Sequence, residues 1–422
     1  MSAWPTTELA SAARTLRGVS FSAADATLDP RPGSIPCLTT AAVKSEPKWD
    51  TARYIPSSLV KDEQLLRPGD ILVSTSNSAE TVGRSCLLSS VPEVATFGAF
   101  VTVVRPDPDV FDARFLASWM RSSAYLKAIA RLKTRTTNIS NIRSSDLGRL
   151  QVPLPPLDEQ RRIAARLRDQ LREVDGLTVG TTARNTELAD FRISVYETAF
   201  PITPLSVTAE SASPDGWTWR SLGSLGRLES GHTPSRSRPD WWGGDIPWIA
   251  LPDIRALDGR HVFETLERTN PEGIAHSAAR VLPADTVVLS RTASVGFVTI
   301  MGRPMATSQD FVNWVCGPDL DPGFLMHLFV RSRERFRSLS AGAVHKTVYF
   351  PTAMALRICV PPFDEQRRIA ARLREQLAEI DRAKAALNAQ RRAVDALPAA
   401  LLREAFGPAQ PLDRWTPWPT IA

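Results

Sequence analysis

The chain has 422 residues, a formal net charge of +6 and 43% hydrophobic residues. Because one hydrophobic core rarely spans this length, two or more domains are expected, and the ordinary composition excludes a largely disordered or disulfide-stapled chain. The sequence has neither a run of about 20 apolar residues nor a basic start followed by an apolar segment, so we expect a cytoplasmic protein without a membrane partner.

The first globular domain is predicted at residues 1–156. The runs at 70–74 and 100–104 are short, rich in β-branched residues and bounded by Gly or Pro, which favours strands, whereas residues 115–132 favour a helix. No regular alternation of strand and helix extends along the chain, so the fold class is predicted to be α+β. The polar loop after the first strand contains two candidate nucleic-acid contacts, Ser76 and Asn77, because hydroxyl and amide groups can bond phosphates or base edges.

A basic segment follows at residues 121–143. It carries six bases and no acid, and threonine, serine and asparagine are interleaved with the bases. Bases attract phosphates, so we interpret the segment as a nucleic-acid contact; the alternative is a solvated helix face followed by a polar loop. The candidate DNA contacts in this segment are Arg131, Lys133, Arg135, Thr136, Thr137 and Asn138.

A helical spacer is predicted at residues 157–205. Asp158 can cap or complement the positive N-terminal end of a helix, and aliphatic residues then recur at intervals of four, four and three, which is typical of a packing seam. Gly176 and Gly180 interrupt the pattern and leave open whether the helix breaks there. The seam residues are Ile163, Leu167, Leu171, Val174 and Leu177, and the pattern resumes at Leu188, Phe191 and Val195.

The second globular domain is predicted at residues 206–362, and its 231–244 and 290–296 loops are polar. Glycine in such loops permits close backbone approach, and arginine can read guanine through two hydrogen bonds. A second basic segment, at 331–357, lies at the position equivalent to the first. The candidate DNA contacts in this domain are Thr233, Ser235, Arg236, Arg291, Ser294, Arg333, Arg337, His345 and Lys346.

A second helical spacer is predicted at 363–407, followed by a tail at 408–422. It contains no glycine before Gly407, which supplies a stop signal, and Pro398 is expected to kink the helix or begin a fresh turn. Two long amphipathic helices at matching positions most simply pack against each other; the alternative is that each covers its own domain. The seam residues of this helix are Ile369, Leu373, Leu377 and Ile380, and the pattern continues at Leu387, Val394 and Leu397.

An internal duplication explains the order domain, helix, domain, helix. The eleven residues DEQRRIAARLR occur at 158–168 and again, unchanged, at 364–374, which is 206 residues later. A repeat of this length is a duplicated domain, since solenoid units run about 20–50 residues. The fainter echoes upstream are Gly-x-Ile-Pro at Gly33 and Gly244, Phe-Val at Phe100 and Phe311, and a glycine-led loop at Gly18 and Gly231.

Motifs for catalysis and cofactor binding are missing. The sequence has no GxxxxGK[ST] loop, no GxGxxG, no HExxH and no Gly-x-Ser-x-Gly, and it lacks the Asn-Pro-Pro-aromatic segment of amino-methyltransferases. The five histidines sit at no metal-ligand spacing, and the four cysteines form no Cys-x-x-Cys pair. We therefore predict a binding protein with no catalytic residue, no metal site and no cofactor of its own.

The combined pattern resembles the specificity subunits of type I restriction–modification systems. The similar features are the proline-bearing entry, the (L/F)DEQ(R)RIA start of a long helix, and the occurrence of this unit twice, each time after a domain with a Gly-x-Ile-Pro segment. The second domain is the nearer match, through Trp217, the Gly-x-Thr-Pro-Ser that begins at Gly231 and the Trp-Gly-Gly-Asp-Ile-Pro-Trp-Ile that begins at Trp242. The first domain departs from this pattern, since Gly-Val-Ser-Phe-Ser stands at Gly18.

The resemblance implies two target recognition domains separated by two long antiparallel helices, with a pseudo-two-fold internal duplication. Each domain would read one half of a bipartite, asymmetric sequence in double-stranded DNA, and the helices would act as a ruler between the halves. The implied partners are two modification subunits, which bind S-adenosylmethionine and methylate adenine, and restriction subunits, which use ATP and Mg. The alternatives are a methylation-only system and a coiled-coil scaffold that binds no DNA.

Overall fold

The computed structural model describes residues 4–78, 80–135, 140–207, 211–340 and 347–407. The chain divides into two compact units. Unit 1 comprises residues 1–182 and 389–422, and unit 2 comprises residues 183–388. Each unit therefore contains one globular domain and one part of each of two long helices.

Unit 1 is built on a four-stranded antiparallel sheet in the order β2-β9-β5-β7. Three smaller sheets accompany it, in the orders β4-β3-β8, β1-β12 and β10-β11-β6. The strands are β1 (Thr6–Glu8), β2 (Ala13–Arg17), β3 (Ser34–Leu38), β4 (Arg53–Pro56), β5 (Ile71–Ser74), β6 (Ser76–Asn77), β7 (Ser85–Leu87), β8 (Thr96–Phe97), β9 (Val101–Pro106), β10 (Thr134–Arg135), β11 (Ser140–Asn141) and β12 (Gln151–Pro153). The helices of this domain are α1 (Leu9–Ala12), α2 (Ala113–Trp119), α3 (Ser123–Leu132) and α4 (Ser144–Gly148), with 3-10 turns η1 (Ala23–Asp25), η2 (Thr40–Ala42), η3 (Trp49–Thr51), η4 (Ser57–Leu59) and η5 (Asp62–Gln64).

The main sheet of unit 1 is buried on both faces, which explains the continuous apolar run of β5. Ile71 and Val73 pack in a core with Phe115 of α2, whereas Leu72 packs in a second core with Leu38 of β3. Successive strand residues point to opposite faces, so a strand covered on both sides loses the usual apolar–polar alternation. The result is a three-layer arrangement of helices, main sheet and small sheet.

Unit 2 is built on a five-stranded sheet in the order β15-β22-β19-β20-β17, with smaller sheets β18-β16-β21 and β13-β23-β14. Its strands are β13 (Leu205–Ser206), β14 (Thr218–Ser221), β15 (Gly226–Ser230), β16 (Trp242–Ile249), β17 (His261–Val262), β18 (Glu267–Thr269), β19 (Val287–Ser290), β20 (Val298–Met301), β21 (Ala306–Thr307), β22 (Phe311–Cys316) and β23 (Arg357–Val360). The helices of this domain are α6 (Leu222–Leu225), α7 (Leu251–Ala256), α8 (Pro271–Ala275), α9 (Pro322–Arg331), α10 (Arg333–Leu339) and α11 (Phe350–Met354), with one 3-10 turn, η6 (Pro239–Trp241).

The two domains share one topology, which confirms the predicted duplication and the α+β fold class. In unit 1 the strand β3 pairs antiparallel with β4 and parallel with β8, and in unit 2 the strand β16 pairs in the same two ways with β18 and β21. The main sheet of unit 2 is also buried on both faces, since Val287 and Val288 belong to different cores. The Gly-x-Ile-Pro echo falls on the equivalent strands β3 and β16.

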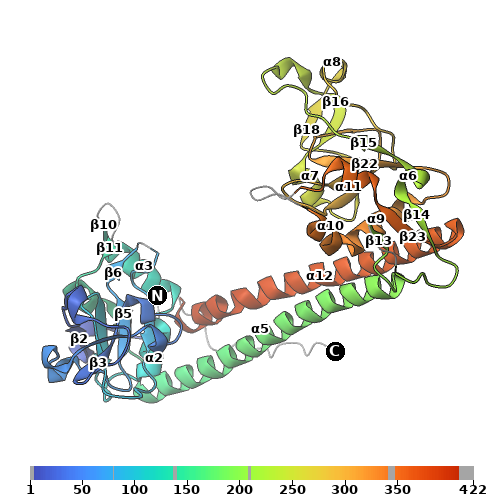
Figure 1. Cartoon of the computed structure of the whole chain (residues 1–422). Helices are drawn as coiled ribbons and strands as arrows, with labels where there is room; N and C mark the ends of the chain where they lie inside the picture. The colour runs from blue at the N-terminus through green and yellow to red at the C-terminus, as the bar shows by residue number, and fades with distance from the viewer. Residues whose placement is uncertain (1–3, 79, 136–139, 208–210, 341–346, 408–422) are drawn as a thin grey trace. The chain divides into compact units, whose positions relative to one another are not determined.

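The two long helices are α5 (Leu157–Ala199) and α12 (Phe363–Phe406), drawn green and red in Figure 1. Helix α5 continues through Gly176 and Gly180, which settles the question left open by the sequence, and it ends before the predicted limit at 205. At Pro398, where a kink or a fresh turn was predicted, α12 continues as one helix to Phe406, so no fresh turn begins there. The predicted stop at Gly407 is confirmed, and the Gly407 N–H donates to the Arg403 carbonyl at 2.7 Å.

Ion pairs join the two helices within each unit. Arg166 pairs with Glu404 in unit 1, and Arg192 pairs with Asp381 at 2.9 Å in unit 2. From the first ion pair to the second, the residue number rises on α5, from 166 to 192, and falls on α12, from 404 to 381. The helices therefore run antiparallel. The two predicted alternatives were that the helices pack against each other and that each covers its own domain. Both hold in part, because α12 also contributes Leu373 to the core of the unit 2 domain.

A seven-residue repeat sets the buried face of α5. Leu167, Val174, Thr181 and Val195 are buried and fall at one heptad position. The inclusion of Leu177 and Phe191 in the seam was wrong, since these side chains are 47% and 54% exposed. They lie three residues after the buried position of a heptad, whereas Leu171 and Thr178, four residues after it, are half-buried. The other seam residues are buried or half-buried: Ile163, Leu171, Ile369, Leu373, Leu377 and Ile380.

A buried glutamine in each copy of the eleven-residue repeat attaches a long helix to its domain. Gln160 accepts a hydrogen bond from the Asp112 N–H and donates to the carbonyls of Val110 and Pro155, each at 2.9 Å. Gln366 makes the equivalent three bonds in unit 2, at 3.0–3.1 Å. Asp112 in turn caps α2, because its Oδ1 accepts from the N–H groups of Arg114 and Phe115.

In the described part of the chain, no helix is long and apolar enough to cross a bilayer. The four cysteines are free thiols. Burial raises the pKa of the Cys37 thiol to about 12 and that of Cys86 to about 11.

Candidate nucleic-acid interface

Strand pairing places the polar loop of unit 1 beside its basic segment. Strand β6 holds Ser76 and Asn77 and pairs antiparallel with β11, which pairs with β10 on its other side (Figure 1). Arg135 lies in β10, so these candidates share one three-stranded sheet. Arg131 is exposed in the last turn of α3, and Lys133 follows directly. The other three candidates of this segment, Thr136, Thr137 and Asn138, lie outside the described residues.

The same arrangement recurs in unit 2. Thr292 forms an antiparallel bridge with Thr347, and the Val348 N–H donates to the Arg291 carbonyl at 2.9 Å. In unit 1 the Ile142 N–H donates to the Thr75 carbonyl at the same distance. Arg291 and Thr75 are therefore equivalent positions, and each polar loop joins the end of its basic segment. The candidates His345 and Lys346 lie outside the described residues.

The glycine-led loops of the two domains are also equivalent. The N–H of Val19 donates to the Phe97 carbonyl at 2.8 Å, and the N–H of His232 donates to the Thr307 carbonyl at 2.9 Å. A Cβ at Gly231 would overlap the Ser308 carbonyl oxygen, so only glycine allows this approach. The loop places Thr233 against Gln309, whose Oε1 accepts from the Thr233 hydroxyl.

Arg333 has a role inside unit 2. Its Nη2 donates to both carboxylate oxygens of Asp258, at 2.6 and 2.7 Å, and its Nε donates to the Gly296 carbonyl at 2.9 Å. Its guanidinium also lies 5.1 Å from the ring centroid of Phe297. A guanidinium held in this way ties α10 to the 290–296 loop and cannot turn to a phosphate without breaking these bonds, so we exclude Arg333 from the proposed interface.

Two other candidate arginines have acidic partners. Arg236 donates to both oxygens of Glu267, at 2.6 and 2.8 Å, and lies 3.8 Å from the ring centroid of Trp242. The hydrogen bond from Arg236 lowers the pKa of Glu267, so this pair stays charged near neutral pH. Arg337 pairs with Glu334 within α10 at 2.6 Å. DNA phosphates would have to compete with these carboxylates.

Arg291 differs from these arginines, because its terminal nitrogens are not engaged. Its Nε donates to the Gln309 carbonyl at 3.2 Å, and its Nη groups make no hydrogen bond to a described residue. The surrounding loop is held in place: the Thr292 hydroxyl donates to Asp310 at 2.6 Å, and Arg255 donates to the Ser294 hydroxyl at 2.8 Å. Arg291 is thus a half-buried arginine on a fixed loop.

Three residues at this position, Gln309, Asp310 and Phe100, were not among the predicted contacts. The Phe-Val repeat at Phe100 and Phe311 lies at or beside them, but its two copies do not occupy equivalent strand positions. Ser74 pairs with Val101, whereas Ser290 pairs with Phe311, so the repeat is displaced by one residue. Phe100 is therefore equivalent to Asp310. Its side chain is 64% exposed, whereas Phe311 is fully buried.

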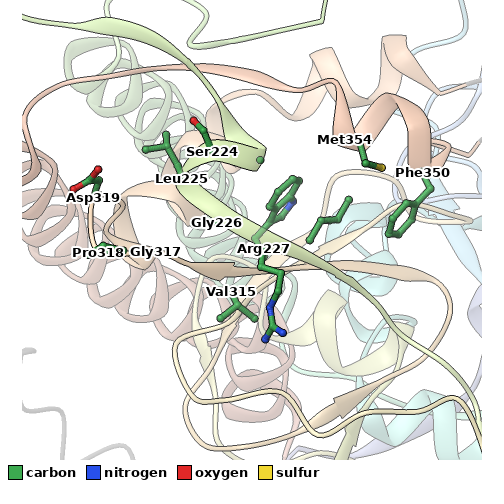
Figure 2. Close-up of a pocket in the computed structure, with 13 residues that line it drawn as sticks. Ser224, Leu225, Gly226, Arg227, Val315, Gly317, Pro318, Asp319, Phe350 and Met354 are labelled. Atoms are coloured by element: carbon green, nitrogen blue, oxygen red, sulfur yellow. The ribbon is translucent and has the colours of Figure 1, made fainter.

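A separate pocket of about 590 Å³ lies along strand β15 of unit 2. Arg227, Asp319, Phe350 and Met354 are among the side chains that line it, as Figure 2 shows. None of its lining residues is a candidate DNA contact. Among the described residues, no group of His, Cys, Asp and Glu side chains is arranged to hold a metal ion.

Comparison with known families gives one match that covers most of the chain. The family model described as "Type I restriction modification DNA specificity domain" matches residues 24–180 and 214–390. The two matched segments contain both candidate loops and both copies of the eleven-residue repeat.

Curated relatives and solved structures agree with this match. The specificity subunit of the type I restriction enzyme StySPI from Salmonella potsdam is 24% identical over 96% of this chain and 88% of its own length. The putative MjaX specificity subunit of Methanocaldococcus jannaschii is 25% identical over 74% of this chain and 73% of its own length. In fold, the HsdS subunit from Thermoanaerobacter tengcongensis is similar with a TM-score of 0.62 and 17% identity, over 96% of each chain. A chain from a structure of type I restriction–modification complex assembly is similar with a TM-score of 0.73 and 18% identity, over 96% of this chain and 97% of its own.

Proposed function

Because the chain belongs to the type I restriction–modification DNA specificity family, we propose that it is the specificity subunit of such a system. It recognises a bipartite, asymmetric sequence in double-stranded DNA and directs partner subunits to it. The observation that carries this proposal is the recurrence, in two domains of one topology, of a polar loop joined to a basic segment. Two diverged copies of one reading site suit a target with two different halves.

Within each domain, bases attract the phosphate backbone and polar loops read base edges. We assign phosphate contacts to Arg131, Lys133, Arg135 and Lys346, and we keep Arg236 and Arg337 as contacts that need the DNA to displace a carboxylate. The remaining contacts, to base edges or nearby phosphates, are Ser76, Asn77, Thr136, Thr137, Asn138, Thr233, Ser235, Arg291, Ser294 and His345.

The paired helices α5 and α12 act as the ruler between the two half-sites. A ruler must be stiff, and both helices continue without a break from one domain to the other. Half-site spacing follows from protein geometry when two reading domains are linked rigidly. The helices and domains also form the docking surface for the partner subunits.

Catalysis belongs to the partners in this proposal. Two modification subunits carry S-adenosylmethionine and methylate adenine, and restriction subunits use ATP and Mg to cleave. The chain works with them in the cytoplasm. A methylation-only system differs only in lacking the restriction partner.

The test maps methylated adenines by long-read sequencing in cells that express this chain with its modification partner, against cells that lack this chain alone. Loss of one split motif, with two defined halves and an unspecified gap, is the expected result. Unchanged methylation by an active modification partner would remove the specificity role and favour a scaffold. A matched strain expresses the chain with Lys133 and Arg135 replaced by alanine. In that strain the chain is present, so the effect of its DNA contacts is separated from the effect of its absence.

A further inference from the structure

The two domains differ in chemistry at one equivalent position of the reading loops, and this difference bears on which bases they read. In unit 1 the Thr75 N–H donates to the Phe100 carbonyl at 2.9 Å, and in unit 2 the Arg291 N–H donates to the Asp310 carbonyl at 2.8 Å. The residues that precede these acceptors, Ala99 and Gln309, are equivalent as well. The backbone frame is conserved within the chain, and the side chains on it are not.

Unit 2 presents hydrogen-bonding groups at this position. The Nη groups of Arg291 and the side-chain amide nitrogen of Gln309 make no hydrogen bond to a described residue, and the two residues are adjacent through the 3.2 Å bond from the Arg291 Nε to the Gln309 carbonyl. Arginine donates two bonds to guanine O6 and N7, and glutamine pairs with adenine N6 and N7. Both side chains suit purines in the major groove.

The loop that carries Arg291 is preorganised. Asp310 accepts from the Thr292 hydroxyl at 2.6 Å and from the Ser308 hydroxyl at 3.0 Å. Ala293 adopts a positive φ of 57°, which a residue with a side chain rarely does and which persists only where its surroundings impose it. A fixed loop loses little freedom on binding, so its arginine can discriminate between bases rather than only attract phosphate.

Unit 1 presents an apolar surface at the same position. Thr75 is buried, and its hydroxyl bonds to the Phe100 carbonyl at 3.2 Å. Ala99 offers no polar side chain, whereas the Phe100 ring is 64% exposed. In the major groove an apolar side chain of this kind contacts the methyl group of thymine.

From these contacts we infer that Arg291 and Gln309 read a purine-bearing position in one half-site, with Arg291 on guanine, while Phe100 contacts a thymine methyl at the corresponding position of the other half-site. The inference rests on the proposed function and deepens it, because it names the residues that make the two half-sites differ. Arg291 and Phe100 are then specificity-determining residues rather than general DNA anchors.

The experiment uses the full chain in complex with its modification subunits and selects binders from duplexes in which both half-sites are randomised. The variants are Arg291→Ala, Arg291→Lys, Gln309→Ala and Phe100→Ala. The control is Arg280→Ala, which removes an exposed arginine that pairs with Glu229 at 3.1 Å in the same unit. Thermal melting confirms that each variant folds, and Arg291→Lys keeps the charge while losing the two-pronged donor.

We expect Arg291→Ala and Arg291→Lys to relax the preference at one base pair of one half-site by roughly 5- to 150-fold, with every other position unchanged. Gln309→Ala should act in the same half-site, and Phe100→Ala should act only in the other. Arg280→Ala should leave the base preference intact. If Arg291→Ala instead weakens binding to all sequences equally and lowers the salt slope by about one, Arg291 is a phosphate contact and the inference is overturned. If the unmodified complex selects no sequence, the proposed function itself fails.

Discussion

Replacing Gln160 with alanine should loosen unit 1 at the point where helix α5 begins. The Gln160 side chain is fully buried and makes three hydrogen bonds of 2.9 Å, to the Asp112 N–H and to the carbonyls of Val110 and Pro155. Alanine makes none of them. Three backbone groups, one buried and two partly buried, then lose their partner, and the cap residue of α2 loses the bond that positions it.

The expected cost follows from these three groups. A buried polar group without a partner costs about 1–3 kcal/mol. Water can enter the space that the side chain leaves and bond some of the groups, so the lower end of this energy range, about 1 kcal/mol, applies to each group. The sum is about 3 kcal/mol, which corresponds to roughly 100-fold faster amide exchange wherever local opening governs exchange.

Hydrogen exchange read by mass spectrometry suits this prediction, because a chain with two units does not unfold in one step. Gln160→Ala should speed exchange at residues 111–119 and leave unit 2 unchanged, while Gln366→Ala should do the reverse. The control is Gln390→Ala, since Gln390 is exposed on α12. Exchange in Gln160→Ala no faster than in Gln390→Ala, or loosening of both units together, would contradict this role of Gln160.

Three further predictions concern binding, pH and backbone space. Replacing Lys133 and Arg135 with alanine should weaken binding of the complex to all duplexes and lower its salt slope by about one unit per lost phosphate contact; an unchanged slope would remove both residues from the interface. Burial lowers the pKa of His327 to about 4, so the unfolded chain binds a proton that the folded chain does not, and the free energy of unfolding should fall as the pH falls from about 6.5 towards 4. The unit 2 transition in urea titrations at pH 7 and 5 should show this loss, and a smaller loss after His327→Phe; equal losses would contradict the assignment. Gly231→Ala should destabilise the folded chain by about 2 kcal/mol, because its Cβ would overlap backbone atoms. Gly180→Ala, which has open space around the Cβ, should stabilise the folded chain by about 0.5–1 kcal/mol. Thermal melts that reverse this order would refute the packing described.

The duplicated topology and the two long helices were predictable because their signals are local and repeated. The eleven-residue segment repeats without change, and its buried glutamine makes the same three bonds in both units. Aliphatic residues at helical spacing predicted most of the seam. The two errors, at Leu177 and Phe191, arose because the hydrophobicity of a residue does not tell whether its position on the helix is buried or exposed.

The continuity of the long helices was not predictable from composition. Glycine costs a helix about 1 kcal/mol relative to alanine, and proline removes one backbone hydrogen bond. These costs are visible in the sequence at Gly176, Gly180 and Pro398. The contacts between the two helices are not visible there, because they join residues about 200 positions apart along the chain, such as Arg192 and Asp381.

The candidate site was predictable by residue type but not by contact. The polar loop and the basic segment were named separately, and only the two-residue strands β6 and β11 show that they adjoin. Arg333 was chosen for its charge, but its partner Asp258 lies 75 residues earlier and cannot be identified from spacing. Gln309 and Phe100 were missed because the two copies of the Phe-Val repeat are displaced by one residue relative to each other. A shift of one residue along a strand moves a side chain from the buried face to the exposed face.

The glutamine attachments have a consequence for how such a chain can change during evolution or by design. Beside the apolar contacts of its core, each globular domain meets its helix through the same set of polar contacts, namely two carbonyls and the N–H of a capping aspartate around Gln160 or Gln366. Recombination between the two identical eleven-residue segments, or between this chain and a relative, would leave these contacts whole. A foreign domain that ends in the same capped loop would keep this polar attachment, and the helix residues that enter the domain core, such as Leu373, are the ones that its apolar face must match.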